Sequence, residues 1–208
     1  MDGDVGDDTY YVDNIGDVIS DPSGFDTVFA SITYTLPNDL NYLTLTGTDD
    51  LNGTGNLFDN TITGNSGNNV LDGGGGVFDI LVGGQGDDTY IVRRFDDTVI
   101  EQANAGIDIV LSSATYTLAA NLETLVLVAG SGNIDGTGNE LDNTITGNSG
   151  DNHLSGEAGN DTLGGGGGGI DFLTGGAGSD RFVLAAGSKS YVTDFAPGSG
   201  GEVIDLDK

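Results

Sequence analysis

A nine-residue pattern recurs ten times in this sequence and restricts the fold more than any other feature. The pattern is G-G-x-G-x-D-x-U-x, in which U is a large apolar residue. An isolated frame opens the chain, and two runs follow, each with one spare glycine, Gly73 or Gly165. The frames are residues 3–11; then 55–63, 64–72, 74–82 and 83–91; then 138–146, 147–155, 156–164, 166–174 and 175–183.

Two positions of the frame keep their character in all ten copies. Position eight is always apolar: Tyr10, Ile62, Leu71, Leu81, Tyr90, Ile145, Leu154, Leu163, Leu173 and Phe182. Position six is always Asp or Asn: Asp8, Asn60, Asn69, Asp79, Asp88, Asn143, Asn152, Asp161, Asp171 and Asp180. Because the frames share one register, they indicate a structure that repeats along the chain.

The chemistry of the frame predicts its shape. Glycine reaches positive φ without a Cβ penalty, so the first half of the frame turns sharply. The last three residues form a short strand, in which the apolar side chain and its neighbours point to opposite faces. One loop and one strand make half a turn of a coil, so frame i stacks on frame i+2. We therefore expect an all-β solenoid with a thin apolar core.

The position-six side chains, beside carbonyls exposed by the glycine turn, favour a calcium site. Ca²⁺ takes six to eight oxygen ligands and tolerates irregular geometry, whereas Mg²⁺ requires a strict octahedron. Zinc prefers His and Cys, and the chain has one His and no Cys. Stacked loops place two position-six side chains around one ion, which predicts about five ions. The expected pairs are Asn60 with Asp79, Asn69 with Asp88, Asn143 with Asp161, Asn152 with Asp171, and Asp161 with Asp180.

Two alternatives concern these loops. Sites that contain Asn carry less charge, so we expect them to bind more weakly. It also stays open that Asp and Asn only shape the turns, which both residues do in many loops.

The charge of the chain excludes one class of partner and favours another. With 33 Asp plus Glu and 5 Lys plus Arg, the formal charge is -28. A general nucleic-acid binder needs basic residues for phosphate contacts, so that class is excluded. Repulsion between the acids opposes compaction, which leads to the hypothesis that the chain is loose without calcium. The apolar runs are too short for a membrane span, and no conventional N-terminal export signal is visible.

A longer repeat divides the chain. "GDDTYYV" at Gly6 returns as "GDDTYIV" at Gly86, and "DNTITGNSG" at Asp59 returns at Asp142. The chain is therefore two copies of a unit of roughly 80 residues. We divide it into a remnant of a preceding roll (1–12), linking rungs (13–54), a first roll (55–91), linking rungs (92–137), a second roll (138–183) and a closing segment (184–208).

The linking segments are expected to form further rungs. "DTVFASITYTL", "YLTLTGTDDL", "DIVLSSATYTL" and "LETLVLV" are rich in β-branched and aromatic residues between Gly, Asp and Pro, which is typical of strands. Asp26 and Asp108 occupy matching G-x-D positions and are either ion ligands or turn residues. Asp194, Glu202 and Asp205 form one more site or are solvated. "VRR" at 92–94 replaces "VDN" of the first copy and is expected to pair with nearby acids.

The frames closely resemble the repeats-in-toxin (RTX) family of hemolysin-type calcium-binding repeats. The resemblance implies a right-handed parallel β-roll with Ca²⁺ between stacked loops, type I secretion from a Gram-negative bacterium, and calcium-triggered folding outside the cell. Val77, Ile80 and the four Asn frames depart from the pattern. The implied metal residues are Asp8, Asn60, Asn69, Gly74, Gly76, Asp79, Gly83, Gly84, Gly86, Asp88, Asn143, Asn152, Gly156, Gly159, Asp161, Gly166, Gly167, Gly169, Asp171, Gly175, Gly176, Gly178 and Asp180.

Three functions compete. The first is a calcium-folded module of a larger exported protein, such as an adhesin, a protease, a lipase or a polysaccharide-modifying enzyme of the alginate epimerase or lyase kind. The second is an enzyme in its own right, but its only His, His153, has no nucleophile pattern around it and is expected to be an exposed strand residue. The third is a surface-binding module, because "GTGN" resembles loops of RTX ice-binding domains; it occurs only at Gly53 and Gly136, too rarely for a regular face.

Overall fold

The computed structural model describes residues 1–185, 188–196 and 201–206. This part of the chain contains 21 short β-strands and no helix. None of the described residues forms a helix that is long and apolar enough to cross a membrane. The contacts divide the chain into two units, Met1–Ile107 and Asp108–Lys208.

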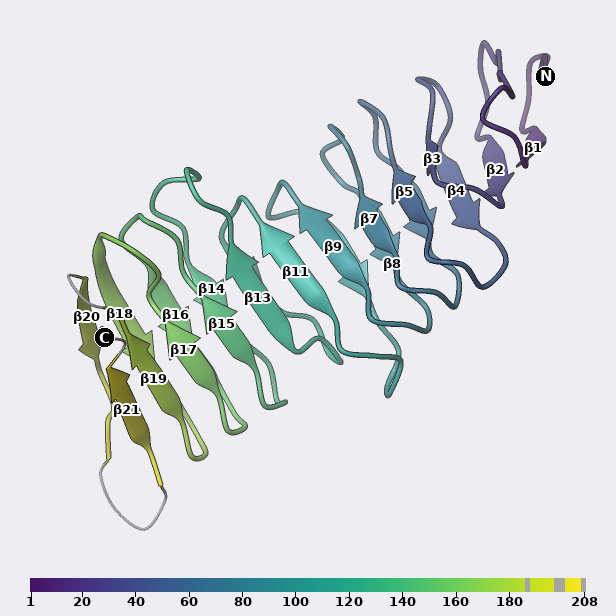
Figure 1. Cartoon of the computed structure of the whole chain (residues 1–208). Helices are drawn as coiled ribbons and strands as arrows, with labels where there is room; N and C mark the ends of the chain where they lie inside the picture. The colour runs from purple at the N-terminus through teal and green to yellow at the C-terminus, as the bar shows by residue number, and fades with distance from the viewer. Residues whose placement is uncertain (186–187, 197–200, 207–208) are drawn as a thin grey trace. The chain divides into compact units, whose positions relative to one another are not determined.

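The first unit is a parallel β-solenoid whose strands alternate between two sheets (Figure 1). One sheet has the order β1 (Thr9–Val12), β2 (Thr27–Ala30), β4 (Tyr42–Leu45), β6 (Thr61–Thr63), β8 (Ile80–Val82) and β10 (Thr98–Ile100). The other contains β3 (Tyr34–Thr35), β5 (Asn52–Thr54), β7 (Val70–Asp72) and β9 (Thr89–Val92).

The second unit repeats this architecture. One of its sheets contains β11 (Ile109–Ser112), β13 (Thr124–Leu127), β15 (Thr144–Thr146), β17 (Thr162–Gly164), β19 (Arg181–Leu184) and β21 (Val203–Leu206). The other has β12 (Tyr116–Thr117), β14 (Gly136–Thr137), β16 (His153–Ser155), β18 (Ile170–Thr174) and β20 (Lys189–Val192). Strands β20 and β21 belong to the closing segment. Residues 186–187, 197–200 and 207–208 of that segment lie outside the described part.

The register of the strands confirms that two frames make one turn. Ile62 lies opposite Leu81 in the β6–β8 pair, and Leu163 lies opposite Phe182 in the β17–β19 pair. In each case the partners are position-eight residues of frames i and i+2, and the strands are parallel. The all-β parallel solenoid expected from the sequence is therefore confirmed.

The core is the stack of position-eight side chains. All ten are buried, and the most exposed of them, Tyr10, is only 5% exposed. The linking segments extend this stack as expected, because Val28, Leu43 and Leu125 in β2, β4 and β13 are fully buried. Each rung therefore buries one or two apolar side chains between two loops. The segment boundaries at residues 12, 54, 91, 137 and 183 stay predictions.

Candidate metal centres

The position-six side chains form a ladder that runs from loop to loop. In each expected pair, Oδ1 of the later residue accepts a hydrogen bond from the backbone amide of the earlier one. The distances are 2.8 Å for Asn60–Asp79, 2.7 Å for Asn69–Asp88, 2.7 Å for Asn143–Asp161, 3.2 Å for Asn152–Asp171 and 3.0 Å for Asp161–Asp180. The structure thus brings together all five pairs of side chains, although this does not test ligation.

Several carboxylates of the ladder keep a buried oxygen without a partner. Asp161 and Asp180 are each 1% exposed, and their Oδ2 atoms have no hydrogen-bond partner among the described residues. The same holds for Asp26, which is completely buried. A buried charge of this kind is costly unless it is paired or binds a metal. These atoms therefore mark places where a cation fits.

The loop glycines make room for the carboxylates. A Cβ on Gly156 would collide with the Asp161 carboxylate and come within 2.6 Å of the Gly175 carbonyl oxygen. A Cβ on Gly175 would likewise collide with Asp180. Position one must therefore be glycine, because the carboxylate and the carbonyl of the next loop occupy the space of a side chain. Carboxylates and carbonyls are hard oxygen donors, which fit Ca²⁺.

The two spare glycines belong to the loops and do not lie outside them. A Cβ on Gly73 would collide with Asp79, and one on Gly165 would collide with Asp171. These residues therefore fill position one of their loops, and the extra residue lies further on in the loop. Frame counting missed Gly73 and Gly165 because it placed them before the turn; the glycine that follows each of them indicates the correct register.

Burial changes the acidity of the ladder. It raises the pKa of Asp79, Asp88 and Asp161 to about 6, in each case chiefly because the charged form loses hydration. Burial also raises the pKa of Asp171 and Asp180. Backbone amides that donate to these carboxylates oppose the rise without cancelling it. The ladder thus holds its negative charge at a cost that a bound cation would remove.

The asparagine frames fill the same space differently. Asn143 donates from Nδ2 to the Leu122 carbonyl at 3.0 Å, and its Oδ1 accepts the Asn139 amide at 2.7 Å. Asn139, at position two, donates from Nδ2 to the carbonyls of Ala119 and Leu122 at 2.7 and 2.8 Å. The other pairs make the same kinds of contact: Asn56 with Asn60, Asn65 with Asn69, and Asn148 with Asn152.

These frames share the sequence G-N-x-x-x-N, which the sequence reasoning did not single out. Its signal is that Asn replaces Gly at position two only where Asn also replaces Asp at position six. The two amide groups supply hydrogen-bond donors to carbonyls of the preceding rung. The polar side chains inside such a loop are therefore neutral, and they already have hydrogen-bond partners in the protein.

A second ladder involves position five. Asp59 Oδ1 accepts from the Val77 and Phe78 amides at 2.7 and 3.1 Å, which lowers the Asp59 pKa. In the second unit, Asp142 likewise accepts a hydrogen bond at 2.6 Å from the backbone amide of Asn160, which lies one turn after Asp142. The sequence reasoning attributed the acids to bound cations, but these carboxylates join successive loops directly. Part of the acidic composition therefore has a structural cause.

Each of the remaining candidate acids makes a different contact. Asp26 Oδ1 accepts the Asp8 amide at 2.8 Å, which extends the position-six ladder to the first frame. Asp194 accepts the amides of Gly175 and Gly176 at 3.1 and 2.8 Å. The other contacts are Glu202 with the Ala196 amide, Asp205 with Arg181, and Asp108, whose amide donates to Glu123 at 2.9 Å.

Two further expectations concern basic residues: the pairing of "VRR" with nearby acids is confirmed for Arg93, and the exposed position of His153 on a strand is confirmed. Arg93 binds Asp72 through two hydrogen bonds, at 3.0 Å from Nε and 2.6 Å from Nη2. His153 is an exposed strand residue on β16; its ring stacks on Phe172, and its Nδ1 lies 3.4 Å from Asp135. The contacts with Phe172 and Asp135 hold the exposed His153 ring against its neighbours.

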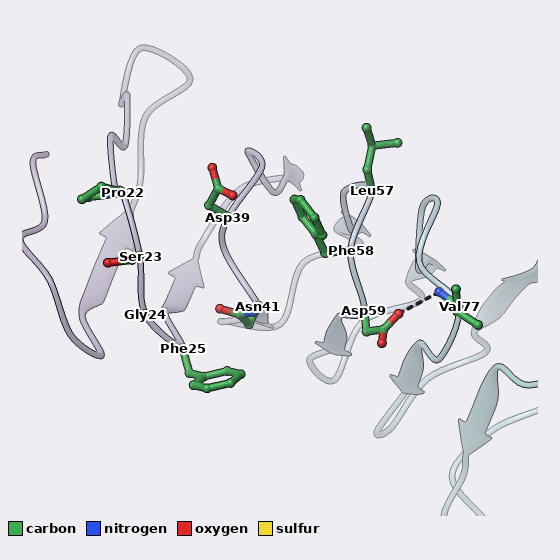
Figure 2. Close-up of a pocket in the computed structure, with 10 residues that line it drawn as sticks. All are labelled: Pro22, Ser23, Gly24, Phe25, Asp39, Asn41, Leu57, Phe58, Asp59 and Val77. Atoms are coloured by element: carbon green, nitrogen blue, oxygen red, sulfur yellow. Dashed lines mark hydrogen bonds between the residues drawn. The ribbon is translucent and has the colours of Figure 1, made fainter.

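A surface pocket of about 630 Å³ lies between loops of the first unit (Figure 2). Phe25 and Phe58, which line it, are 65% and 52% exposed. Asp59 also lines it, but this carboxylate holds the Val77 amide, as the dashed line in Figure 2 shows. The pocket is open and mixes apolar side chains with two acids, Asp39 and Asp59, of which Asp59 has a structural role.

Comparison with known families agrees with this geometry. The model of the RTX calcium-binding nonapeptide repeat matches four times, at residues 54–77, 78–99, 137–169 and 166–188. These stretches of the chain are RTX calcium-binding repeats. The repeat is a structural, calcium-binding element and not a catalytic one. Searches of curated proteins and of solved structures found no significant match.

Proposed function

We propose that the chain is a module that folds on binding extracellular Ca²⁺ and so supports type I secretion and stabilisation of a larger exported protein. The observation that carries the proposal is the Asp161–Asp180 pair. Both carboxylates are buried, they are stacked in successive loops, and each has an oxygen without a partner in the described part. Both residues lie in stretches that match the model of the RTX calcium-binding repeat, which supports the proposal.

The aspartate frames supply the ion ligands in this proposal. Asp79, Asp88, Asp161, Asp171 and Asp180 would hold about five ions together with carbonyls of the glycine loops. Bound calcium supplies positive charge that offsets the buried carboxylates. Asn60, Asn69, Asn143 and Asn152 contribute less, because their amides already bind backbone groups. The strongest site is therefore Asp161–Asp180, the pair with two carboxylates.

Calcium concentration would then decide where the chain folds. Calcium sites of extracellular modules typically have Kd values of roughly 10⁻⁴–10⁻³ M, so they are empty in a low-calcium cytosol. Ion binding that requires the folded state stabilises that state by mass action. A chain with a formal charge of -28 stays loose before export and becomes compact outside the cell. A sugar-binding or enzymatic partner domain remains compatible with this role.

The test is a calcium titration of the metal-stripped chain, followed by far-UV circular dichroism and calorimetry, with Mg²⁺ as the control. We expect a cooperative gain of β-structure with Ca²⁺ at sub-millimolar to millimolar concentration and none with Mg²⁺. A metal-stripped chain that is already folded and resistant to protease would contradict the proposal.

A further inference from the structure

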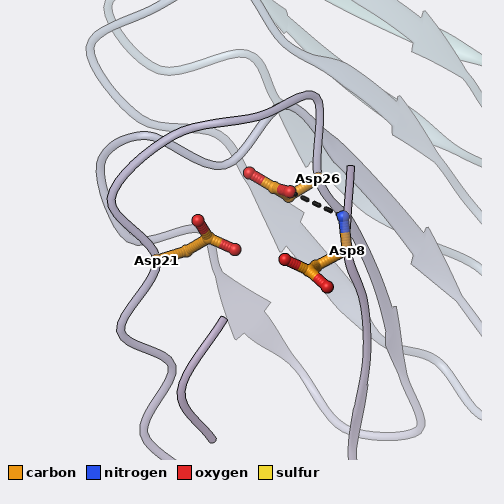
Figure 3. Close-up of side chains that lie close together, drawn as sticks. All are labelled: Asp8, Asp21 and Asp26. Atoms are coloured by element: carbon orange, nitrogen blue, oxygen red, sulfur yellow. Dashed lines mark hydrogen bonds between the residues drawn. The ribbon is translucent and has the colours of Figure 1, made fainter. Parts of the chain in front are cut away.

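Three carboxylates converge outside the stretches that match the RTX repeat. Asp8 ends the loop of the first frame, whereas Asp21 and Asp26 belong to the linking segment. Each offers an oxygen atom, and these atoms all lie within 4.8 Å of one another. Figure 3 shows the three side chains pointing toward a common space. Two ligands of one Ca²⁺ ion, with bonds of roughly 2.3–2.6 Å, lie at most about 5 Å apart.

Asp26 supplies an independent reason to expect a ligand here. Its side chain is completely buried, Oδ1 accepts the Asp8 amide at 2.8 Å, and Oδ2 has no hydrogen-bond partner in the part of the chain that the structure describes. No basic side chain can neutralise the cluster from nearby sequence, because Arg93 is the first Lys or Arg of the chain. A buried carboxylate without a partner requires a cation or a proton.

Asp21 is held in place by groups that leave its charge intact. The Tyr10 hydroxyl donates to Asp21 Oδ2, and the Ser23 amide donates to Oδ1 at 3.1 Å. Gly3 makes room for this contact, since a Cβ there would collide with both the Tyr10 hydroxyl and Asp21. Tyr10 also contributes its ring to the apolar core, so it joins the core to the acidic cluster.

The chain builds the same arrangement a second time. Four residues recur 80 positions later: Gly3, Asp8, Tyr10 and Asp21 match Gly83, Asp88, Tyr90 and Glu101. The Tyr90 hydroxyl donates to Glu101, and a Cβ on Gly83 would collide with Tyr90, Asp88 and Glu101 alike. Asp88 and Glu101 are both buried. An acid of either length is therefore compatible with this position.

We propose that Asp8, Asp21 and Asp26 hold a Ca²⁺ ion that fastens the first frame to the linking rungs, with Tyr10 as the positioning residue for Asp21. Asp88 and Glu101 are the counterparts in the second copy. Oxygen donors in irregular loops favour Ca²⁺ over Mg²⁺. Since Asp21 and Glu101 lie outside the nonapeptide frames, the site adds a ligand from the linking segment to the roll.

The experiment uses Tb³⁺ as a luminescent probe and the full chain. The chain has no Trp, so Tyr11→Trp places a single tryptophan on the exposed side of β1, where Tyr11 is 72% exposed. Selective excitation of this residue sensitises only Tb³⁺ that binds close to it. We expect saturable luminescence that Ca²⁺ displaces.

Substitutions in the Tyr11→Trp background then locate the ion. Asp21→Asn keeps the shape of the side chain but removes its charge and one of its two acceptor oxygens, and should weaken Tb³⁺ binding by about tenfold or more. Asp21→Glu, the residue that the second copy uses, should preserve binding. Asp13→Asn, an exposed acid in the same segment, is the matched control with the same change of charge and should have no effect.

Two results would overturn the inference: no sensitised signal in the Tyr11→Trp chain, or the same affinity in Asp21→Asn as in Asp13→Asn. Near-UV circular dichroism of the introduced tryptophan shows whether the Asp21→Asn variant keeps its local fold. Asp161→Asn in the second roll should leave the local signal unchanged. If the signal persists while calcium does not fold the chain, the proposed function fails and this site stands.

Discussion

At the scale of single residues, positive φ in the loops favours glycine, and Glu157 is one of four described non-glycine residues that adopt it. Glu157 occupies position two of its frame with φ of 76°, where the equivalent Gly84 and Gly176 have 111° and 97°. The left-handed region costs a non-glycine residue about 1–2 kcal/mol. The Ser155 hydroxyl bonds to the Glu157 carboxylate at 2.9 Å and recovers part of this cost.

Glu157→Gly should therefore stabilise the folded chain in calcium by about 1 kcal/mol. The gain comes from relief of the left-handed conformation, reduced by the added flexibility of the unfolded chain. Urea unfolding measures it. Glu140→Gly, at an exposed loop position without positive φ, is the control and should bring no gain; equal effects of the two changes would contradict this account.

The glycine at position one leads to a different prediction, because a side chain there has no space, whatever the backbone conformation. In Gly156→Ala the new Cβ meets the Asp161 carboxylate and the Gly175 carbonyl. We expect a loss of about 2–3 kcal/mol in the free energy of unfolding and weaker calcium binding by calorimetry. Gly167→Ala, which meets no atom within 4 Å and has no positive φ, should be close to neutral. A neutral Gly156→Ala would show that the loop relaxes freely.

At the scale of structural elements, each loop closes by one of two kinds of chemistry. The G-N-x-x-x-N loops use amide groups that bind backbone carbonyls. The aspartate loops use carboxylates, of which Asp161 and Asp180 keep an oxygen without a hydrogen-bond partner among the described residues. Both occupy the same place between rungs, so their strands pair in the same register. The neutral loops should therefore depend on calcium less than the aspartate loops do.

Two reciprocal substitutions test this difference between loops. In EDTA at neutral pH, Asp161→Asn should raise the free energy of unfolding by about 1–3 kcal/mol, because a buried charge with a raised pKa is removed. Asn143→Asp should lower it, because the amide donors to Leu122 are lost and a charge is buried. In calcium, Asp161→Asn should instead be destabilising. Far-UV circular dichroism gives the folded fraction in EDTA with a stabilising osmolyte, and denaturant unfolding gives the stability in calcium. Identical effects of each substitution in the two conditions would refute the distinction.

At the scale of the whole molecule, a charge of -28 makes stability depend on protons as well as calcium. The pKa values of Asp79, Asp88 and Asp161 are about 6 in the folded, ion-free chain, above the ordinary value of 3.8. Between these values the folded chain binds more protons than the unfolded chain. Stability of the ion-free form therefore rises as pH falls through about 6.

We expect the metal-stripped chain to be more stable toward unfolding at pH 5 than at pH 7, by a few kcal/mol. Calcium affinity should fall over the same window, because protons compete for the carboxylates. The folded fraction in EDTA, followed by far-UV circular dichroism in the presence of a stabilising osmolyte, and calorimetry with calcium measure the two trends. The Asp161→Asn variant should show a smaller pH dependence. A metal-stripped chain that loses stability between pH 7 and pH 5 would contradict the prediction.

The features that depend on the short period follow from the order of the amino acids alone. Glycine turns and x-U-x strands repeat every nine residues, so the parallel strands, the buried rank of position eight and the five stacked pairs all follow from one register. A repeated local preference leaves few ways to stack. The RTX repeat was recognisable for the same reason.

Which polar groups meet across that register depends on the three-dimensional fold. The Tyr10 hydroxyl reaches Asp21, the Asn143 amide reaches Leu122, and Gly73 lies against Asp79. The partners of these contacts lie in loops whose lengths vary, so the nine-residue period alone does not predict them. Periodicity specifies where a strand lies, but the pairing of a buried polar atom depends on the neighbours that folding brings to it, and only the folded chain reveals those.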